Sequence, residues 1–370
     1  EIRRATAAFG RDANLIPGRV DTDDGLAAGR KHPGDLPVAA TDVEHAFGSG
    51  HLVSSERQDL LLVLGVGTVG EPVDPPVGVV LPQVTRRIAR WLSIRLARHS
   101  DAGYVAGMKF SVWPNMSHAP SEVFDTARWA EDSGMFGVWY ADHYMPNTGD
   151  ESFTPGDTHE CWAMLPAIAA LTERVRVGTL VSPTSVHHPA VLANRAASVD
   201  HISNGRMVLG VGAGWQINEH KAYGIELEAP KQRVDRFDEA IQIIRSLMSA
   251  DRTTFDGDVY SITDAPSDPK PSQSPLPILV GTGSPRMLRI TARHADEWNT
   301  WGGPDMSGGA REKFNTACAA VDRDPATMWT SVQALVFVTD DDATAQKISE
   351  SPMGTRSIAG TADKIVDLMG

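Results

Sequence analysis

From Met108 to the C-terminus, short apolar runs alternate with longer amphipathic stretches. This alternation is typical of repeated βα units, in which each helix returns the chain to the same edge of a parallel sheet. We predict strands at residues 109–113, 137–140, 175–181, 207–211, 278–281, 297–301 and 331–338. We predict helices at residues 121–133, 160–171, 189–202, 233–248, 285–294, 309–321 and 343–349. The expected fold is an α/β TIM barrel of the (β/α)8 type.

The predicted barrel is one strand short. Seven strands are followed by the start of an eighth unit at residues 361–369, and the sequence then ends at Gly370. An open parallel sheet would leave an unpaired edge. We therefore expect residues 108–370 to be a barrel truncated at its C-terminus and missing its last strand.

Residues 1–107 have a different texture, rich in Gly, Pro and Asp and without a sustained period before Gln58. This composition favours a mostly disordered, largely irregular N-terminal extension. Two segments could order, an apolar run at 60–69 and an amphipathic stretch at 84–99, but each is too isolated to bury a core of its own. The sequence starts without Met, and Met108 directly precedes a predicted strand, so one hypothesis is that translation begins at Met108 and residues 1–107 are not native coding sequence.

Charge and composition narrow the classes of partner. The formal net charge is −13, which works against binding to nucleic acid or an anionic membrane. No apolar run reaches the length of a membrane span, and neither a signal peptide nor a CxxC pair is present. We expect a cytoplasmic protein that binds a small molecule, with no metal site and with Cys161 and Cys318 as packing residues.

Ligands of such barrels bind at the C-terminal ends of the strands. Asp142 and His143 follow the second predicted strand, where His143 could exchange a proton while Asp142 fixes its tautomer or contacts a ligand. The alternative is a helix-capping Asp and a solvated His. Leu180 and Val181 end the third strand, either as an ordinary turn or as a bulge that exposes backbone groups to a ligand.

Two glycine-rich strand ends complete the predicted rim. The fourth strand ends in GVGAGW, where Trp215 would stack on a ligand ring or plug the barrel. After the fifth strand, Gly281, Thr282 and Gly283 precede a helix that opens with Pro285, an arrangement that favours an anion site. The adjacent histidines at 187 and 188 are expected to serve a loop.

Taken in order, several strings carry a specific resemblance. They are WAEDSGMFGVWYADHY, LTERVRVGTLVSPTSVHHPAVLANRAASVDHISNGRMVLGVGAGWQINEHKAYGI, RVDRFDEAIQIIRSLM, TFDGDVY, PKPSQSPLPILVGTGSP and ARHADEWN. From Met108 onward the chain resembles the luciferase-like monooxygenase superfamily, and within it the coenzyme F420-dependent oxidoreductases. The resemblance implies an insertion at about 253–275 and a homodimer.

The resemblance also implies roles for individual residues. Asp142 and His143 would flank the reactive deazaflavin or flavin ring. Leu180 and Val181 would form a bulge against it, often with a non-prolyl cis peptide. Ala213 and Asn218 would contact the ring or ribityl groups. The cofactor phosphate would bind at Gly281, Thr282 and Gly283.

The implied reaction is hydride transfer between coenzyme F420 and an unknown small organic substrate, with His143 as acid or base. Some deazaflavin-dependent sugar-phosphate dehydrogenases carry an acidic residue where this chain has Trp215, which disfavours that substrate class. Two alternatives stay open at this point. One is an FMN-dependent monooxygenase on the same fold, and the other is a protein that binds the cofactor without catalysis.

Overall fold

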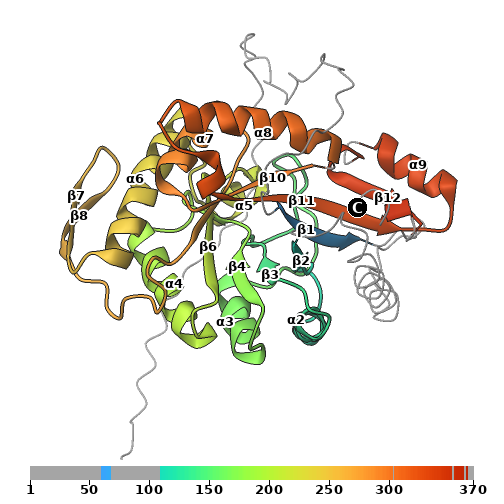
Figure 1. Ribbon diagram of the computed structural model, residues 1–370, viewed down its shortest axis with the longest axis horizontal. Coiled ribbons are helices and arrows are strands. Elements are labelled where there is room, and N and C mark those ends of the chain that lie inside the picture. Colours follow the sequence, from blue (N-terminus) through green and yellow to red (C-terminus); the bar gives the residue numbers. More distant parts are fainter. Residues whose placement is uncertain (1–59, 68–108, 303, 352–353, 362–363, 366–370) are drawn as a thin grey trace, which may run out of the picture. The chain divides into compact units, whose positions relative to one another are not determined.

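The computed structural model describes residues 60–67, 109–302, 304–351, 354–361 and 364–365. In this part of the chain a parallel sheet closes on itself, because its first strand pairs with both its second and its eleventh (Figure 1). The strands of the ring are, in spatial order, β1 (Leu60–Gly67), β2 (Lys109–Trp113), β3 (Gly137–Tyr140), β4 (Arg176–Thr179), β6 (Met207–Gly212), β9 (Ile278–Gly281), β10 (Glu297–Trp301) and β11 (Trp329–Val338). Two short strands lie off this ring: β5 (Ser182–Pro183) pairs with β6, and β12 (Ser357–Gly360) pairs with β11. The predicted α/β barrel is confirmed.

Strand β1 corrects the expectation that one place in the ring would stay empty. Leu61 pairs with Lys109 of β2 on one side, and Leu60 pairs with Thr330 of β11 on the other. The predicted run at 60–69 is isolated along the sequence, but its described part, residues 60–67, meets in space the two strand edges that the missing strand would leave open. The predicted amphipathic stretch at 84–99 lies outside the described residues, as does most of the expected eighth unit.

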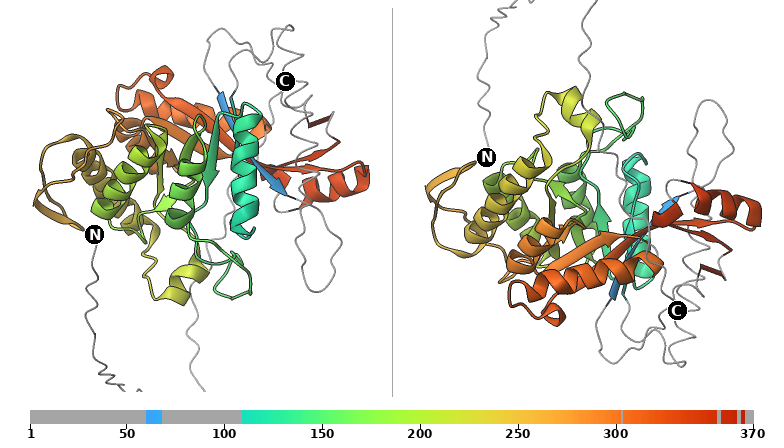
Figure 2. Two further views of the ribbon diagram at one scale, coloured as in Figure 1. Left: turned by 90° about the horizontal axis from the view of Figure 1, so that it is seen from below. Right: turned by 90° about the horizontal axis from the view of Figure 1, so that it is seen from above.

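The helices lie outside the ring, and Figure 1 shows α2, α3 and α4 on one side of the strands and α7 and α8 on the other. In Figure 2, α2 (teal) is the nearer helix in the view from below and α8 (orange) is the nearer one in the view from above. Several helices begin with proline at a position where its missing N–H costs nothing. The helices are α2 (Pro120–Asp132), α3 (Cys161–Leu171), α4 (Pro189–Ser203), α5 (Ile217–Tyr223), α6 (Pro230–Ser249), α7 (Pro285–His294), α8 (Pro304–Ala319) and α9 (Asp342–Glu350).

The expected insertion forms an antiparallel hairpin, β7 (Thr253–Asp256) with β8 (Ser261–Ala265), beside α6 (Figure 1). Two short 3-10 helices, Pro325–Thr327 and Gly354–Arg356, precede β11 and β12. No helix among the residues described is both long and apolar enough to cross a membrane.

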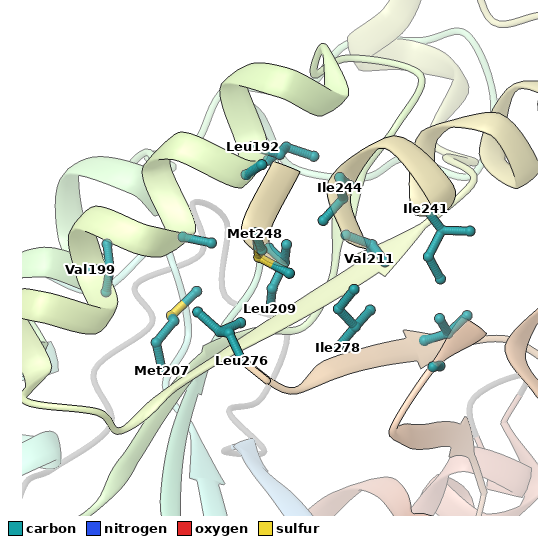
Figure 3. Packing of buried hydrophobic residues seen from close by; sticks show 14 of the residues in the cluster. Leu192, Val199, Met207, Leu209, Val211, Ile241, Ile244, Met248, Leu276 and Ile278 are labelled. Atoms are coloured by element: carbon teal, nitrogen blue, oxygen red, sulfur yellow. The ribbon is translucent and has the colours of Figure 1, made fainter. Parts of the chain in front are cut away.

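The main core lies between the strands and the helices that cover them. Figure 3 shows Leu209 and Val211 of β6 packed beneath Leu192 of α4 and Ile241 of α6. Because side chains alternate along a strand, the other set of β6 residues, which includes Val208 and Gly210, faces the inside of the ring. Val208 accordingly packs in a second cluster with Trp139, Leu180 and Leu279.

The inside of the ring is charged at the end where the strands begin. Arg176 pairs with the buried carboxylate of Glu297, and the ammonium of Lys109 lies 4.1 Å from the centre of the Trp329 ring. These contacts fill the N-terminal end of the interior, which in such barrels serves stability. A ligand site is therefore expected at the opposite end.

Candidate active site

Asp142 lies just after β3 and is fully buried. Its Oδ2 atom accepts hydrogen bonds from the hydroxyl of Ser182, from Nε1 of Trp162 at 3.1 Å and from Nε2 of His187 at 2.9 Å. Its Oδ1 atom is also buried and has no hydrogen-bond partner among the residues that the structure describes. Asp142 is thus an anion held by one oxygen, with the other left available as an acceptor.

Two opposing effects act on the pKa of Asp142. Burial is the largest single effect and raises the pKa, but the hydrogen bond and electrostatic effect of His187 and the hydrogen bond from Ser182 together outweigh it. The net result is a pKa below the usual value for an aspartate, so the carboxylate stays ionised.

His187 is not the loop residue that was expected, because it lies buried beside Asp142. Arg195 lies 3.4 Å from its Nδ1 atom, and an arginine can only donate. Nδ1 must then accept, so Nε2 carries the proton that is donated to Asp142. The neighbouring His188 does serve the loop: it is the N-cap of α4, where its side chain accepts from the N–H of Ala190.

His143 pairs with a different carboxylate from the one expected. Its Nδ1 atom lies 3.0 Å from Oε1 of Glu219, and the Glu219 side chain is only 2% exposed. The prediction that Asp142 fixes the His143 tautomer is wrong, because Asp142 is turned to His187. The alternative of a solvated histidine fails as well, because only 16% of the His143 side chain is exposed.

Helix α5 holds the segment that follows His143. Oε2 of Glu219 accepts the N–H of Tyr144 at 3.0 Å, and the side-chain amide of Gln216 donates to the carbonyl of Met145 at 3.0 Å. The side-chain amide of Asn218 donates to the carbonyl of Pro146 at 2.8 Å. Glu219, Gln216 and Asn218 thus join the chain that follows β6 to the chain that follows β3. We call these three residues the α5 clasp.

Asn218 is therefore already occupied. Its Oδ1 atom accepts the N–H of Glu219 at 3.0 Å while its amide binds Pro146, and the side chain is fully buried. Its expected contact with a ring or ribityl group stays a prediction. Ala213, expected beside it, is half-buried and packs against the main core.

A glycine-lined cradle lies at the ends of β4, β6 and β9. The peptide bond between Leu180 and Val181 is cis, as the resemblance implied. The Val181 side chain packs directly against Gly212 and Gly281, which have no side chains. A Cβ atom added at Gly212 would lie 2.8 Å from the Val181 side chain, and one added at Gly281 would lie 3.2 Å from it. At Gly210 a Cβ would lie 1.9 Å from the carbonyl oxygen of Thr179, so only glycine fits there.

The predicted anion loop follows β9. Nε1 of Trp298, in β10, donates to the carbonyl of Thr282 at 2.9 Å, and this hydrogen bond holds the loop to the neighbouring strand. Gly283 is exposed, and a Cβ built there would meet nothing within 4 Å. Helix α7 begins at Pro285 without a side-chain hydrogen bond at its N-cap, Ser284. The space and the uncapped amides suit an anion.

Buried polar atoms on three strands of the ring have no partner among the described residues, and two of them, on Trp113 and Trp139, belong to the cluster that packs with Val181. Nε1 of Trp113, Nε1 of Trp139 and Nε2 of Gln333 are buried and unpartnered among the described residues, and each belongs to a strand of the ring or its end. Native structures leave few such groups unmatched. A planar ligand with carbonyl oxygens and ring nitrogens would fit donors of this kind together with a glycine-lined surface.

Trp215 neither plugs the ring nor lies in the core. It is 56% exposed, and its ring meets the His143 imidazole edge to face with centroids 5.6 Å apart. Tyr223, 58% exposed, packs against Tyr144 next to it. An apolar rim thus borders the His143 side of the site.

The described residues contain no group of three or more His, Cys, Asp or Glu side chains that could hold a metal ion. Cys161 and Cys318 are both buried. Burial raises the pKa of the Cys161 thiol well above its usual value, and its Sγ donates to the carbonyl of Tyr140. Neither cysteine has the environment of a nucleophile.

Sequence reasoning found Asp142 and His143 from their position after a strand, but it missed their partners. Glu219, His187, Ser182 and Trp162 lie between 20 and 76 residues away along the chain. Each of them also follows a predicted strand or opens a predicted helix near the same rim. That shared position was the available signal.

Comparison with known proteins places this geometry in a family. The family model described as luciferase-like monooxygenase matches residues 100–364, well over half of the chain. The F420-dependent glucose-6-phosphate dehydrogenase of Amycolatopsis mediterranei is 35% identical over 190 residues, which cover 50% of this chain and 55% of that protein. The enzyme of the same name from Kineococcus radiotolerans is 35% identical over 189 residues, covering 51% and 54%. The chain thus spans about half the length of these curated relatives.

Solved structures share the fold at lower identity. An F420-dependent secondary alcohol dehydrogenase in complex with an F420-acetone adduct has a TM-score of 0.58 at 21% identity, covering 70% of this chain and 81% of that one. The coenzyme F420-dependent tetrahydromethanopterin reductase of Methanopyrus kandleri has a TM-score of 0.56 at 18% identity, covering 66% and 73%. With the family model matched across the barrel, the chain belongs to the luciferase-like monooxygenase family.

Proposed function

We propose that this protein is an oxidoreductase that binds coenzyme F420 and transfers a hydride between it and a small organic substrate. The observation that carries the proposal is the cradle of Val181, Gly210, Gly212 and Gly281. It adjoins Trp113 and Trp139, whose buried indole nitrogens have no hydrogen-bond partner in the described part of the chain. The curated relatives named F420-dependent add support for the choice of cofactor.

The residues that would hold the cofactor lie on three strand ends. Leu180 and Val181 would support the ring, with Asp142, His143 and Ala213 at its sides. The loop Gly281, Thr282 and Gly283 would bind the phosphate through backbone amides. Asn218 would reach the cofactor through the second hydrogen of its amide, since the first is donated to the carbonyl of Pro146.

When bound, the deazaflavin would supply a carrier for one hydride, which is two electrons and a proton. The protein's own residues then orient the substrate, exclude water and move a proton. His143 is the proposed acid or base, because its Nδ1 is occupied by Glu219 and its Nε2 remains for a substrate proton. Trp215, packed on the edge of that imidazole, would limit the access of water.

The proposed substrate carries no phosphate. The exposed neighbours of His143 and Tyr144 are the rings of Trp215 and Tyr223, and the nearby Lys221 is paired with Glu151. The curated relatives are named for glucose 6-phosphate, so this molecule is the direct comparison. An assay of the F420-loaded protein should show reduction of F420 with an uncharged alcohol and none with glucose 6-phosphate; the reverse pattern contradicts the proposed substrate class.

We also propose a cytoplasmic homodimer, a state implied by the family resemblance and compatible with two unpaired buried cysteines. Light scattering on the purified chain would measure the oligomeric state. A monomer at micromolar concentration would contradict this part of the proposal.

Cofactor choice is tested by titrating the purified protein separately with F420 and with FMN while following tryptophan fluorescence. We expect saturable quenching with F420 at lower concentration than with FMN. Tighter FMN binding, together with oxygen consumption by the reduced complex, would point to a monooxygenase instead. Tight F420 binding without redox turnover over a broad substrate panel would point to a non-catalytic binding protein.

A further inference from the structure

Glu219 is a buried carboxylate whose two oxygens contact consecutive residues of a distant loop. Oε1 lies 3.0 Å from Nδ1 of His143, and Oε2 accepts the backbone N–H of Tyr144 at 3.0 Å. The first contact spans 76 residues of sequence. An ionised carboxylate can only accept hydrogen bonds, so Nδ1 of His143 must donate.

We propose that Glu219 is a positioning residue that keeps a proton on Nδ1 of His143 and leaves Nε2 as the atom that exchanges a proton with the substrate. In the neutral imidazole one nitrogen donates and the other accepts, so fixing the proton on Nδ1 decides the role of Nε2. When Nε2 takes up a proton, the negative charge of Glu219 stabilises the imidazolium. The catalytic meaning of this arrangement rests on the proposed function, whereas the tautomer itself does not.

The Glu219 side chain is held so that it cannot turn away from His143. Its second oxygen is fixed by Tyr144, and its own N–H donates to Oδ1 of Asn218. The helix that carries it is tied to the loop after β5, because the Ser185 hydroxyl donates to Nε2 of His220 at 2.9 Å. The His220 ring is oriented for this by its Nδ1, which donates to the carbonyl of Gln216.

Asp142 makes no hydrogen bond to His143. Its Oδ2 atom accepts the hydrogen bond from Nε2 of the other histidine, His187. Trp215 meets the His143 ring from the side, which further restricts its rotation. His143 and His187 are therefore oriented by separate carboxylates, those of Glu219 and Asp142. Of these two histidines, His143 has the more exposed side chain.

The proton and the electrons balance for an alcohol substrate. The hydroxyl proton would move to Nε2 of His143, the carbinol hydrogen would leave as a hydride, with its two electrons, for a bound oxidised deazaflavin to accept, and the C–O single bond would become a carbonyl. In the reverse direction Nε2 returns the proton to the oxygen. Glu219 keeps its charge in both directions.

The first test reads the tautomer without any cofactor. The full chain is labelled with ¹⁵N-histidine, and long-range ¹H–¹⁵N spectra are recorded at a pH where the imidazole is neutral. The chain has 12 histidines, so the His143→Gln variant assigns the signal. We expect His143 to be protonated at Nδ1 in the wild type, and at Nε2 in Glu219→Leu, where the acceptor is gone.

Gln216→Leu is the matched control, since it removes another bond of the α5 clasp and leaves Glu219 in place. We expect this variant to keep the Nδ1-protonated form. Protonation of wild-type His143 at Nε2 overturns the proposal and needs no variant that might misfold. A tautomer that is unchanged in Glu219→Leu overturns it as well.

The second test uses F420-loaded protein. Glu219→Gln should lower kcat about 100-fold, within the usual range for acid–base groups, while KM changes less than about threefold. An unchanged kcat overturns the proposal. If no substrate supports turnover in the wild type, the proposed function fails, and the tautomer measurement alone decides the role of Glu219.

Discussion

Nε2 of His187 lies 2.9 Å from Oδ2 of Asp142, and both side chains are buried. Burial raises the pKa of Asp142, and the hydrogen bonds from His187 and Ser182 lower it. The lowering is the larger effect, so the pKa in the folded protein lies below the usual value. A depressed folded pKa stabilises the protein above the unfolded value, about 3.9, and that contribution is lost as the pH falls through the folded pKa.

Asp142→Asn should consequently change the shape of the stability curve. At pH 7 the amide oxygen can still accept from His187, Trp162 and Ser182, but it lacks the negative charge, and the amide NH2 takes the place of the unpartnered buried oxygen, which together should cost about 2 kcal/mol of unfolding free energy. The difference between wild type and variant should shrink as the pH falls below about 4. Urea unfolding at a series of pH values measures both effects. Parallel curves from pH 7 to pH 3 would show that Asp142 is not held as an anion.

Gly210 faces a backbone carbonyl that cannot move aside. Because an added Cβ would lie 1.9 Å from the oxygen of Thr179, Gly210→Ala should lower the unfolding free energy by about 1–3 kcal/mol, the usual cost of overpacking. Gly283→Ala is the control, since its Cβ would meet nothing within 4 Å. Thermal melting compares the two variants, and an equal melting temperature for both would contradict the geometry of the cradle.

Much of the barrel could be predicted from the sequence. The predicted strands 109–113, 137–140, 278–281 and 297–301 and the predicted helix 285–294 have the bounds that the structure shows. Each is a short apolar run or an amphipathic stretch bounded by Gly, Pro or polar residues, so local periodicity was sufficient. Helix α5 was missed because seven residues are too few for a periodic stripe.

What local patterns could not supply is contact between distant residues. Strand β1 was assigned to a disordered extension because its neighbours in sequence offer no partner, whereas its partner Thr330 lies far along the chain. The same limit applies to the site. Position after a strand identified Asp142 and His143, but no periodicity indicates that His143 meets Glu219 and Asp142 meets His187.

The role of β1 can be tested by truncation. A chain that starts at Ser55 keeps β1, and a chain that starts at Met108 loses it and leaves one edge each of β2 and β11 unpaired. We expect the first to melt near the full-length temperature and the second to melt lower and aggregate, since open strand edges template pairing between chains. If the chain from Met108 melts as high as the full-length protein and stays dispersed, β1 does not close the barrel.

The anion loop predicts a charge effect on cofactor affinity. In Gly283→Asp the new side chain would occupy open space beside the uncapped start of α7 and repel a phosphate. We expect the Kd for F420 to rise about tenfold, equivalent to about 1.4 kcal/mol. Gly283→Asn is the matched control because it has the same shape without the charge. Fluorescence titration at low salt measures both, and equal affinities would remove Gly283 from the phosphate site.

His143 carries the sharpest kinetic expectation. Its Nδ1 is bound to Glu219, so the ring presents Nε2 at the partly exposed side of the pair, beside Trp215. His143→Ala should lower kcat by about 100-fold to 10,000-fold, the range of general acid–base groups, while the Kd for F420 changes little.

His201→Ala is the control, because this exposed histidine near the end of α4 binds only the carbonyl of Lys270 and the Ser272 hydroxyl among the contacts described. Steady-state kinetics together with fluorescence titration separates the two effects. Full turnover in His143→Ala would leave the proton transfer to another group, and a large loss of F420 affinity with unchanged kcat would make His143 a binding residue instead.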